Sequence, residues 1–217
     1  MNPYYLTARV FFGAWFGLYH RWRVYHPERV PTEGGFILAS NHASFFDPPL
    51  IGSACPRDIS YLARESLLRF PVVGHVMRGV NALPVDRDGG GGAGLKAILN
   101  RLHAGGGIIL FPEGTRTRDG RLQPARSGIG LTVIKSHTPV LPVRIFGSFE
   151  AFNRSMRFPR PHPIVVKFGR PLPFAELRAE ATSCSKPRLK AIYQQVADEL
   201  MAAIARLEPC ADKDRFP

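Results

Sequence analysis

Short apolar runs alternate with stretches of helical periodicity along this 217-residue chain, and that alternation limits the fold more than any other feature. Runs of strand length lie at 35–40, 81–85 and 108–111, each bounded by polar or turn-forming residues. The longest helical pattern begins at Pro187 and places apolar side chains on one face as far as Ile204. Strands that alternate with helices predict an α/β fold, with a largely parallel or mixed sheet flanked by helices.

The rest of the chain follows the same alternation. Further strands are expected at 58–63, 139–146 and 164–169, and further helices at 48–54, 74–80, 127–136 and along Leu95–Leu102, before the glycines at 105–107. No internal repeat or long linker divides the chain. We therefore expect an N-terminal helical segment at 1–30, followed by one α/β domain at 31–217.

The N-terminal segment contains ten consecutive uncharged residues, Val10–Tyr19, several of them aromatic. About twenty apolar residues are needed to span a bilayer as a helix, so this stretch is too short. Arg9, Arg21 and Arg23 flank it, which is typical of an amphipathic helix that lies in the membrane interface. The alternative is a helix that packs on the protein's own core.

The chain is strongly basic, with a formal net charge of +12 at pH 7. Such a charge predicts a polyanionic partner: nucleic acid, an anionic membrane surface or a phosphorylated metabolite. The basic residues are scattered and carry no recognition-helix, RNA-binding or zinc-finger signature, which disfavours nucleic acid. The widely spaced Cys55, Cys184 and Cys210 predict neither a disulfide framework nor a zinc site, and they favour a reducing, cytoplasmic setting.

Three polar motifs each follow a predicted strand directly. N-H-A-S-F-F-D begins after 35–40, D-R-D after 81–85 and P-E-G-T-R after 108–111. Open α/β sheets bind ligands in the crevice at the carboxyl ends of their strands. We therefore expect the three motifs to line one site.

The first motif places His42 in a loop and Asp47 at the start of a predicted helix, where Pro48 suits the first helical position. In that geometry Asp47 can accept a hydrogen bond from one imidazole nitrogen of His42, which leaves the other nitrogen free to take a proton. This is the base-orienting arrangement of a catalytic triad, without a serine nucleophile. The alternative is that Asp47 only caps the helix and His42 is an ordinary loop residue.

The third motif offers an acid, a free backbone, a hydroxyl and a guanidinium in Glu113, Gly114, Thr115 and Arg116. Arginine binds phosphate oxygens in a bidentate fork, and glycine lets the backbone approach a ligand closely. Arg87 in the second motif is also suited to a phosphate. The alternatives are a tight turn with a Glu113–Arg116 surface pair and, for Arg87, a solvated charge cluster.

Together and in this order, these motifs resemble those of the PlsC-type glycerolipid acyltransferases, the 1-acyl-glycerol-3-phosphate acyltransferases. The resemblance covers about residues 30–172. The third family block, F-P-E-G-T-R, is complete at 111–116, and the first, N-H-x-S-x-x-D, is met in full by Asn41, His42, Ser44 and Asp47. The other features match in part: Arg87 with Pro84 in place of the usual aromatic, Arg126 as the basic residue after the third block, and Pro142 in the apolar fourth.

The resemblance implies that His42 is the general base on a lipid hydroxyl and that Asp47 orients it. The alkoxide would attack the thioester of an acyl-CoA or acyl-carrier protein and convert lysophosphatidic acid into phosphatidic acid, without a metal or a permanently bound cofactor. Backbone amides near Pro49–Ile51 would stabilise the oxyanion. The implied substrate-binding residues are Asn41, Ser44, Arg87, Glu113, Gly114, Thr115, Arg116, Arg126 and Pro142.

The expected partners are an anionic membrane surface, a lysophospholipid and the acyl donor, but no nucleic acid. The protein is expected at the cytoplasmic face of the membrane, as a peripheral or monotopic protein. Arg154, Arg157 and Arg160 are candidates for headgroup contacts. Three alternatives stay open: another lysolipid or glycerol 3-phosphate as the acceptor, an acyl thioesterase that uses water, and a basic nucleic-acid-binding module.

Overall fold

The described strands form one mixed, largely parallel sheet in a computed structural model that describes residues 3–64, 70–85 and 92–212. The strand order is β1-β7-β6-β2-β5-β3-β4, and only β6 and β7 pair antiparallel. The expected α/β fold is therefore confirmed. The strands are β1 (Arg23–Tyr25), β2 (Phe36–Ser40), β3 (Ile59–Arg64), β4 (Ala82–Val85), β5 (Gly107–Leu110), β6 (Val140–Phe146) and β7 (Val165–Phe168).

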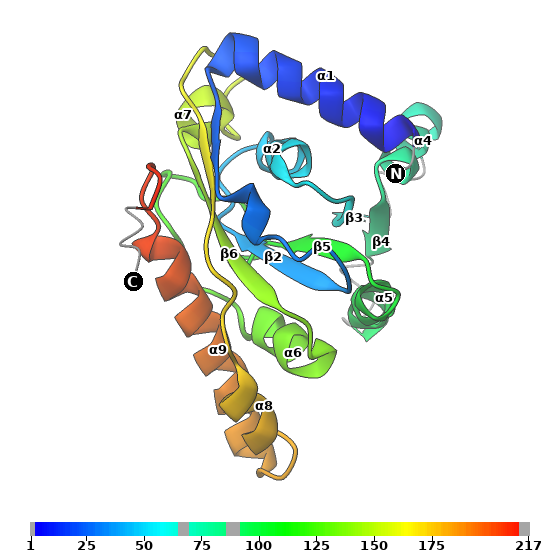
Figure 1. Cartoon of the computed structure of the whole chain (residues 1–217), viewed down its shortest axis with the longest axis vertical. Coiled ribbons are helices and arrows are strands. Elements are labelled where there is room, and N and C mark those ends of the chain that lie inside the picture. The colour runs from blue at the N-terminus through cyan, green and yellow to red at the C-terminus, as the bar shows by residue number, and fades with distance from the viewer. Residues whose placement is uncertain (1–2, 65–69, 86–91, 213–217) are drawn as a thin grey trace.

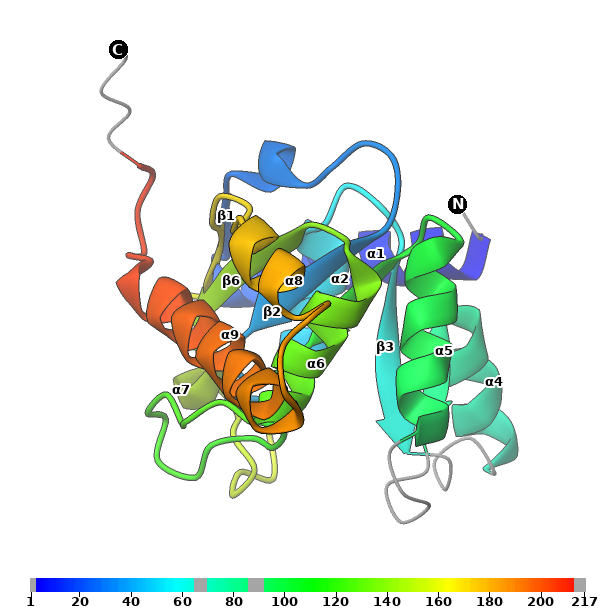
Figure 2. The same ribbon diagram turned by 90° about the horizontal axis from the view of Figure 1, so that it is seen from below.

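Helices cover both faces of this sheet, as Figures 1 and 2 show from two directions. One face carries α1 (Pro3–His20) and α2 (Asp47–Ala54). The other face carries α5 (Gly92–His103), α6 (Ser127–Ser136) and α9 (Lys186–Arg206). The remaining described helices are η1 (Pro27–Arg29), α4 (Pro71–Gly79), α7 (Ser148–Phe152) and α8 (Ala175–Glu180).

Two buried clusters hold the layers together, and β2 contributes to both. Leu38 belongs to the cluster under α1 and α2, whereas Ile37 and Ala39 belong to the cluster under α5, α6 and α9. Successive strand residues point to opposite faces, so a strand between two helical layers must be apolar throughout. All five residues of β2 are buried, and β2 is therefore a rigid base for the loop that follows it.

The expected elements are present, with ends that differ by three residues or fewer. The short elements β1, α7 and α8 were missed, because β1 has only three residues and the two helices are too short to show a helical repeat. The expected helical segment at 1–30 was wrong beyond His20. Arg21 takes a left-handed backbone (φ 46°), and Arg23–Tyr25 then join the sheet beside β7.

The N-terminal helix α1 has one buried face and one exposed apolar face. Tyr5, Phe16 and His20 are buried, and α1 lies across α2 at the top of Figure 1 with its N-terminal end beside α4. The outer face exposes large apolar side chains, namely Tyr4, Leu6, Val10, Phe11, Leu18 and Tyr19. Packing on the protein's own core therefore accounts for only one side of α1. Within the described residues, no helix is both long enough and apolar enough to cross a membrane.

Candidate active site

Two of the three polar motifs meet at the carboxyl ends of adjacent strands. The loop that carries His42 follows β2, and the F-P-E-G-T-R segment follows β5, which pairs with β2 in parallel. The structure therefore brings these two motifs together, as the sequence predicts. Strand β4 also ends at this edge of the sheet, but the second motif, with Arg87, lies outside the described residues.

Asp47 is fully buried and holds the loop that precedes it. Its Oδ2 accepts hydrogen bonds from the backbone N–H groups of Ala43 at 2.6 Å and Ser44 at 2.7 Å. The same oxygen also contacts the imidazole of His42, whose Nδ1 lies 2.8 Å away. Because Oδ2 is an acceptor in this arrangement, Nδ1 of His42 is the donor to it, and Nε2 is left to act as the base.

The helix-capping alternative for Asp47 is wrong. The N-cap of α2 is Phe46, and Asp47 is the first helical residue. Its carboxylate faces back to the loop rather than forward to the first helical turn, because the loop amides and His42 are its donors. The other oxygen, Oδ1, is buried and has no hydrogen-bond partner among the described residues.

The imidazole of His42 is also held by an aromatic contact. The ring stacks on Phe111 with 3.8 Å between ring centroids and 14° between ring planes. The His42 side chain remains 18% exposed, so a substrate can still reach it. Phe111 is the first residue of F-P-E-G-T-R, and its contact with the base was not foreseen, because a motif does not say which way a side chain points.

Glu113 is buried beneath the His42 loop. Its Oε1 accepts the backbone N–H of His42 at 2.9 Å, and its Oε2 accepts that of Gln123 at 3.3 Å. Burial raises the pKa of Glu113 to about 7, the negative charge of Asp47 adds to this effect, and the two amide hydrogen bonds oppose it. A carboxylate placed in this way is a structural partner of the loop. Gln123 was not foreseen, since it lies outside the motifs.

Pro112 of the F-P-E-G-T-R segment is buried, whereas Gly114, Thr115 and Arg116 lie at or near the surface. Gly114 has a left-handed backbone (φ 70°), which glycine adopts without strain, and Thr115 is exposed. The guanidinium of Arg116 lies over the ring of Phe45, 3.6 Å from its centroid. Arg126 is exposed, and its side chain passes beside Gly114. Arg116 thus lies close to the loop that carries His42, and Arg126 lies beside Gly114.

Asn41 and Ser44 bond within the protein. Asn41 donates from Nδ2 to the carbonyl of Ile145 at 3.0 Å and accepts from the Ile145 N–H at 2.8 Å. Ser44 donates from Oγ to the carbonyl of Phe152 at 2.5 Å and accepts from the N–H of Phe46 at 3.0 Å. These bonds tie the His42 loop to β6 and α7. Pro142 lies farther back, inside β6, where it pairs in register with Ala39.

The amides expected to form an oxyanion site are not available as donors. Pro49 has no N–H, and the N–H of Leu50 donates to the Phe46 carbonyl at 2.8 Å. This part of the expectation was wrong, because the start of α2 already uses its donors inside the helix. Within the described residues, no group of three His, Cys, Asp or Glu side chains is arranged to hold a metal ion.

The buried Asp47, the His42 beside it and the segment after β5 form a site suited to general-base chemistry. A profile of the Acyltransferase family matches residues 21–146, and the chain belongs to this family. It is 30% identical over 147 residues to the 1-acyl-sn-glycerol-3-phosphate acyltransferase of Limnanthes douglasii, covering 65% of this chain and 51% of that protein. It is 29% identical over 126 residues to the protein of the same name from Bacillus subtilis, covering 58% and 62%.

The chain spans between half and two thirds of the length of these two relatives. The fold is also that of a solved structure, the 1-acyl-sn-glycerophosphate (LPA) acyltransferase PlsC from Thermotoga maritima. The two structures agree with a TM-score of 0.72 over 94% of this chain and 80% of the other, at 24% sequence identity. The similarity therefore extends beyond the matched sequence to α8 and α9.

Proposed function

We propose that this protein transfers a fatty acyl group from a thioester donor to the free hydroxyl of 1-acyl-glycerol 3-phosphate, which yields phosphatidic acid for phospholipid synthesis. The observation that carries the proposal is the 2.8 Å contact between Nδ1 of His42 and the buried carboxylate of Asp47. The names of the relatives in Limnanthes douglasii and Bacillus subtilis support the choice of acceptor.

In the proposed reaction, Nε2 of His42 takes the proton of the acceptor hydroxyl as its oxygen attacks the thioester carbonyl. The tetrahedral intermediate then collapses, the carbon–sulfur bond breaks, and the thiolate receives the proton from His42. Asp47 stabilises the imidazolium that forms between these two steps. A positioned general base typically contributes about 10² to 10⁴-fold to the rate.

The acceptor's phosphate is proposed to bind to arginines at the same edge of the sheet. Arg116 and Arg126 are the candidates in the segment after β5, and Arg87 is a third candidate outside the described residues. A guanidinium matches two phosphate oxygens at once, so these residues favour a phosphorylated acceptor over water. A thioesterase uses water as its acceptor and does not need such residues, so their presence disfavours a thioesterase.

The acyl donor is proposed to be an acyl-CoA or an acyl-carrier protein, and the reaction is proposed to need neither a metal nor a permanently bound cofactor. The thioester already carries an activated acyl group. The chemical step therefore requires only a base, an acid and stabilisation of the oxyanion.

We further propose that α1 docks the protein on the cytoplasmic face of an anionic membrane. Leu18 is 88% exposed and Phe11 63%, which is costly for side chains in contact only with water. The inner face of α1 packs through Phe16 on Phe46, the residue before Asp47, with 5.5 Å between ring centroids. A membrane in contact with the outer face would thus lie close to the His42 loop, where a lysophospholipid could enter.

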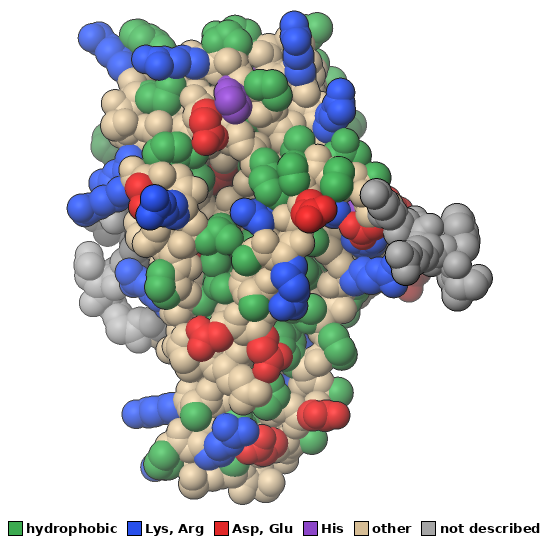
Figure 3. Space-filling model, turned by 90° about the vertical axis from the view of Figure 1, so that its left-hand side faces the viewer, with side chains coloured by type: hydrophobic (Ala, Val, Ile, Leu, Met, Phe, Trp, Pro, Cys, Tyr) green, Lys and Arg blue, Asp and Glu red, His purple; other side chains and the backbone are tan. Residues whose placement is uncertain are grey.

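The distribution of basic side chains also favours a lipid surface over nucleic acid as the partner. On the face seen in Figure 3, Lys and Arg side chains lie among hydrophobic patches and do not form one continuous stripe. A stripe is expected for a nucleic-acid track, whereas a mixture of basic and apolar side chains suits a headgroup boundary. Arg157 lies over the ring of the exposed Phe158, 5.5 Å from its centroid, and Arg154 of the same loop is also exposed. This loop is therefore a second candidate for lipid contact.

The decisive experiment is acyl transfer by the purified protein in vesicles, with a long-chain acyl-CoA and with or without lysophosphatidic acid. Free CoA and phosphatidic acid are measured for the wild type, His42→Ala and Asp47→Asn. We expect phosphatidic acid to form only with the acceptor present, and its rate to fall by about 10² to 10⁴-fold in both variants. His103→Ala, a change of an exposed histidine at the end of α5, is the matched control.

Other outcomes separate the alternatives. CoA release that does not need an acceptor indicates a thioesterase. Transfer to a different lysolipid or to glycerol 3-phosphate keeps the reaction and changes the acceptor. If neither acyl-CoA nor an acyl-carrier protein supports transfer to any of these acceptors, the proposal is wrong.

A further inference from the structure

Both carboxylate oxygens of Glu113 are already used inside the protein. Oε1 accepts from the backbone N–H of His42 at 2.9 Å, and Oε2 accepts from that of Gln123 at 3.3 Å. The residue is 3% exposed. Resemblance to the acyltransferases assigns the whole E-G-T-R segment to substrate, but a buried anion with two amide donors offers nothing to a phosphate. Two negative groups also repel each other, and more strongly at a buried site.

The same segment holds the other side of the His42 backbone. The N–H of Thr117 donates to the His42 carbonyl at 2.9 Å. Together with the stacking of Phe111 on the imidazole, residues of one segment thus contact the N–H, the carbonyl and the ring of His42. A base must be held within a fraction of an ångström to be effective, and partners behind it typically supply that precision.

We propose that Glu113 is a positioning residue: its carboxylate fixes the His42 backbone so that the imidazole faces the acceptor hydroxyl, and it does not bind the acceptor's phosphate. Glu113 and Thr117 thus hold the backbone of His42, and Arg116 is the candidate for the substrate's phosphate. The inference rests on the proposed acyl transfer, and it assigns Glu113 and Arg116 of the E-G-T-R segment to different tasks.

The ionised carboxylate is the form that performs this task, because a protonated one gives up an acceptor site to carry its proton. Burial raises the pKa of Glu113 to about 7. The charged group that acts on it is Asp47, whose negative charge also raises the pKa of Glu113, and the His42 backbone is its hydrogen-bond donor. The Arg126 side chain passes beside the neighbouring Gly114. The hydrogen bond to the His42 N–H should therefore strengthen as the pH rises through about 7.

The kinetic test compares Glu113→Gln with Arg116→Gln in the acyl-transfer assay. Gln at 113 keeps the size of the side chain but turns one oxygen into an amide nitrogen, which cannot accept from a backbone N–H. We expect kcat to fall by about 10 to 100-fold in Glu113→Gln with the KM for lysophosphatidic acid within about twofold. Arg116→Gln should show the reverse pattern, a KM raised about tenfold or more and a smaller change in kcat.

A second measurement does not depend on activity. The backbone amide signals of His42 and Gln123 are followed by ¹H–¹⁵N NMR from pH 5 to 9 in the wild-type protein. Both N–H groups face the same carboxylate, so we expect them to titrate together with a midpoint near 7. In Glu113→Gln the shared titration should be lost at Gln123, and any residual shift at His42 would report its own imidazole.

The outcomes distinguish this inference from the proposed function. A higher KM with unchanged kcat in Glu113→Gln, or amides of His42 and Gln123 that do not titrate together, would overturn the positioning role even if the enzyme is active. Failure of wild-type acyl transfer with every donor and acceptor would refute the proposed function, while the NMR result would still decide whether Glu113 holds the loop. If Glu113→Gln does not fold, the wild-type titration alone decides.

Discussion

Gly114 shows how one residue shapes the site. It closes a tight turn in which its N–H donates to the Phe111 carbonyl at 3.0 Å, and its φ is +70°. A Cβ at this position would lie 2.9 Å from Cδ of Arg126. The backbone that joins Phe111 to Arg116 is therefore compatible with glycine and strained for any other residue.

We expect Gly114→Ala to destabilise the protein by about 1–2 kcal/mol, the cost of a left-handed backbone, and to lower Tm by about 2–8 °C. Gly128→Ala is the matched control, because Gly128 lies in the first turn of α6 with no atom within 4 Å of an added Cβ. Alanine there should be neutral or slightly stabilising. Equal melting temperatures for the two variants would show that the turn at Gly114 is not constrained. Thermal unfolding followed by circular dichroism gives both values.

At the scale of elements, α1 and the His42 loop behave as one packed unit. Trp15, Phe16 and His20 of α1 each contact the ring of Phe46, with centroid distances of 5.1, 5.5 and 5.3 Å. Phe46 precedes Asp47, and Ser44 ties the same loop to α7. Removal of α1 should therefore disturb the base, as well as any membrane contact.

The outer face of α1 can be tested separately from its inner face. We expect the double substitution Phe11→Ser with Leu18→Ser to weaken binding to anionic vesicles about tenfold or more, because each side chain would lose about 1.5–3 kcal/mol of apolar burial in lipid. Its melting temperature should stay close to that of the wild type. Phe16→Ala, on the buried face, is the contrasting variant and should cost about 3–5 kcal/mol of stability. Vesicle sedimentation measures binding, and unchanged sedimentation of the double variant would exclude α1 as the docking element.

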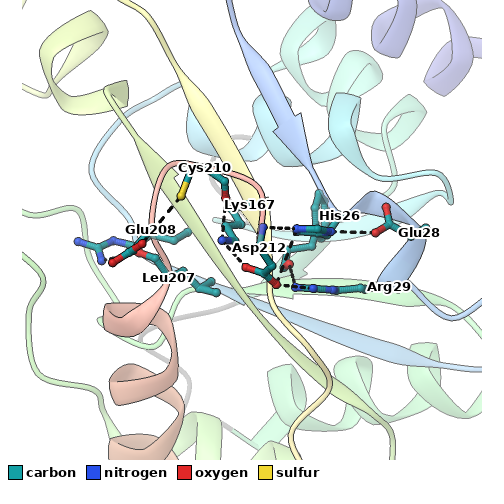
Figure 4. Close-up of polar contacts among 10 residues, drawn as sticks. His26, Glu28, Arg29, Lys167, Leu207, Glu208, Cys210 and Asp212 are labelled. Carbon is teal, nitrogen blue, oxygen red and sulfur yellow. Dashed lines mark hydrogen bonds and ion pairs between the residues drawn. The ribbon is translucent and has the colours of Figure 1, made fainter. Parts of the chain in front are cut away.

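At the scale of the whole molecule, the segment after α9 is fastened across the edge of the sheet. The carboxylate of Asp212 pairs with Lys167 of β7, 2.6 Å away, and with Arg29 of η1 (Figure 4). His26 accepts the backbone N–H of Asp212 at 3.0 Å through Nε2. Residues more than 180 positions apart are thereby joined, and the charge of the buried Lys167 is compensated.

The ion pairs of Asp212 with Lys167 and Arg29 predict a specific dependence of stability on pH. The hydrogen bonds from Lys167 and Arg29 lower the pKa of Asp212 from 3.8 to about 2 in the folded protein. The ionised carboxylate therefore favours folding above about pH 4, and this contribution is lost as the pH falls through about 2. We expect Asp212→Asn to be less stable than the wild type at pH 6 and the difference to shrink towards zero near pH 2. Urea unfolding at several pH values measures it, with Asp198→Asn, an exposed site on α9, as the control. A difference that does not change with pH would contradict this account.

The local sequence pattern was sufficient to predict most of the strands and helices and to identify the motifs. Apolar runs such as 108–111 and the repeat after Pro187 depend on neighbouring residues only, so periodicity reveals them. The pairing of His42 with Asp47 was also accessible, since five positions separate them and Pro48 marks the helix start. Three-residue β1 was not accessible, because it is a strand only through its pairing with β7.

Contacts between distant residues were decided by the tertiary structure alone. Glu113 lies 71 positions from His42, and nothing in either motif says that its carboxylate meets a backbone amide and not a substrate. The same holds for the stacking of Phe111 and for which face of α1 is buried. Motif residues reveal which chemistry a chain can perform, because side-chain chemistry is local. Their division into base, support and substrate contacts follows from where parallel strands β2 and β5 place their loops, and only the folded chain determines that.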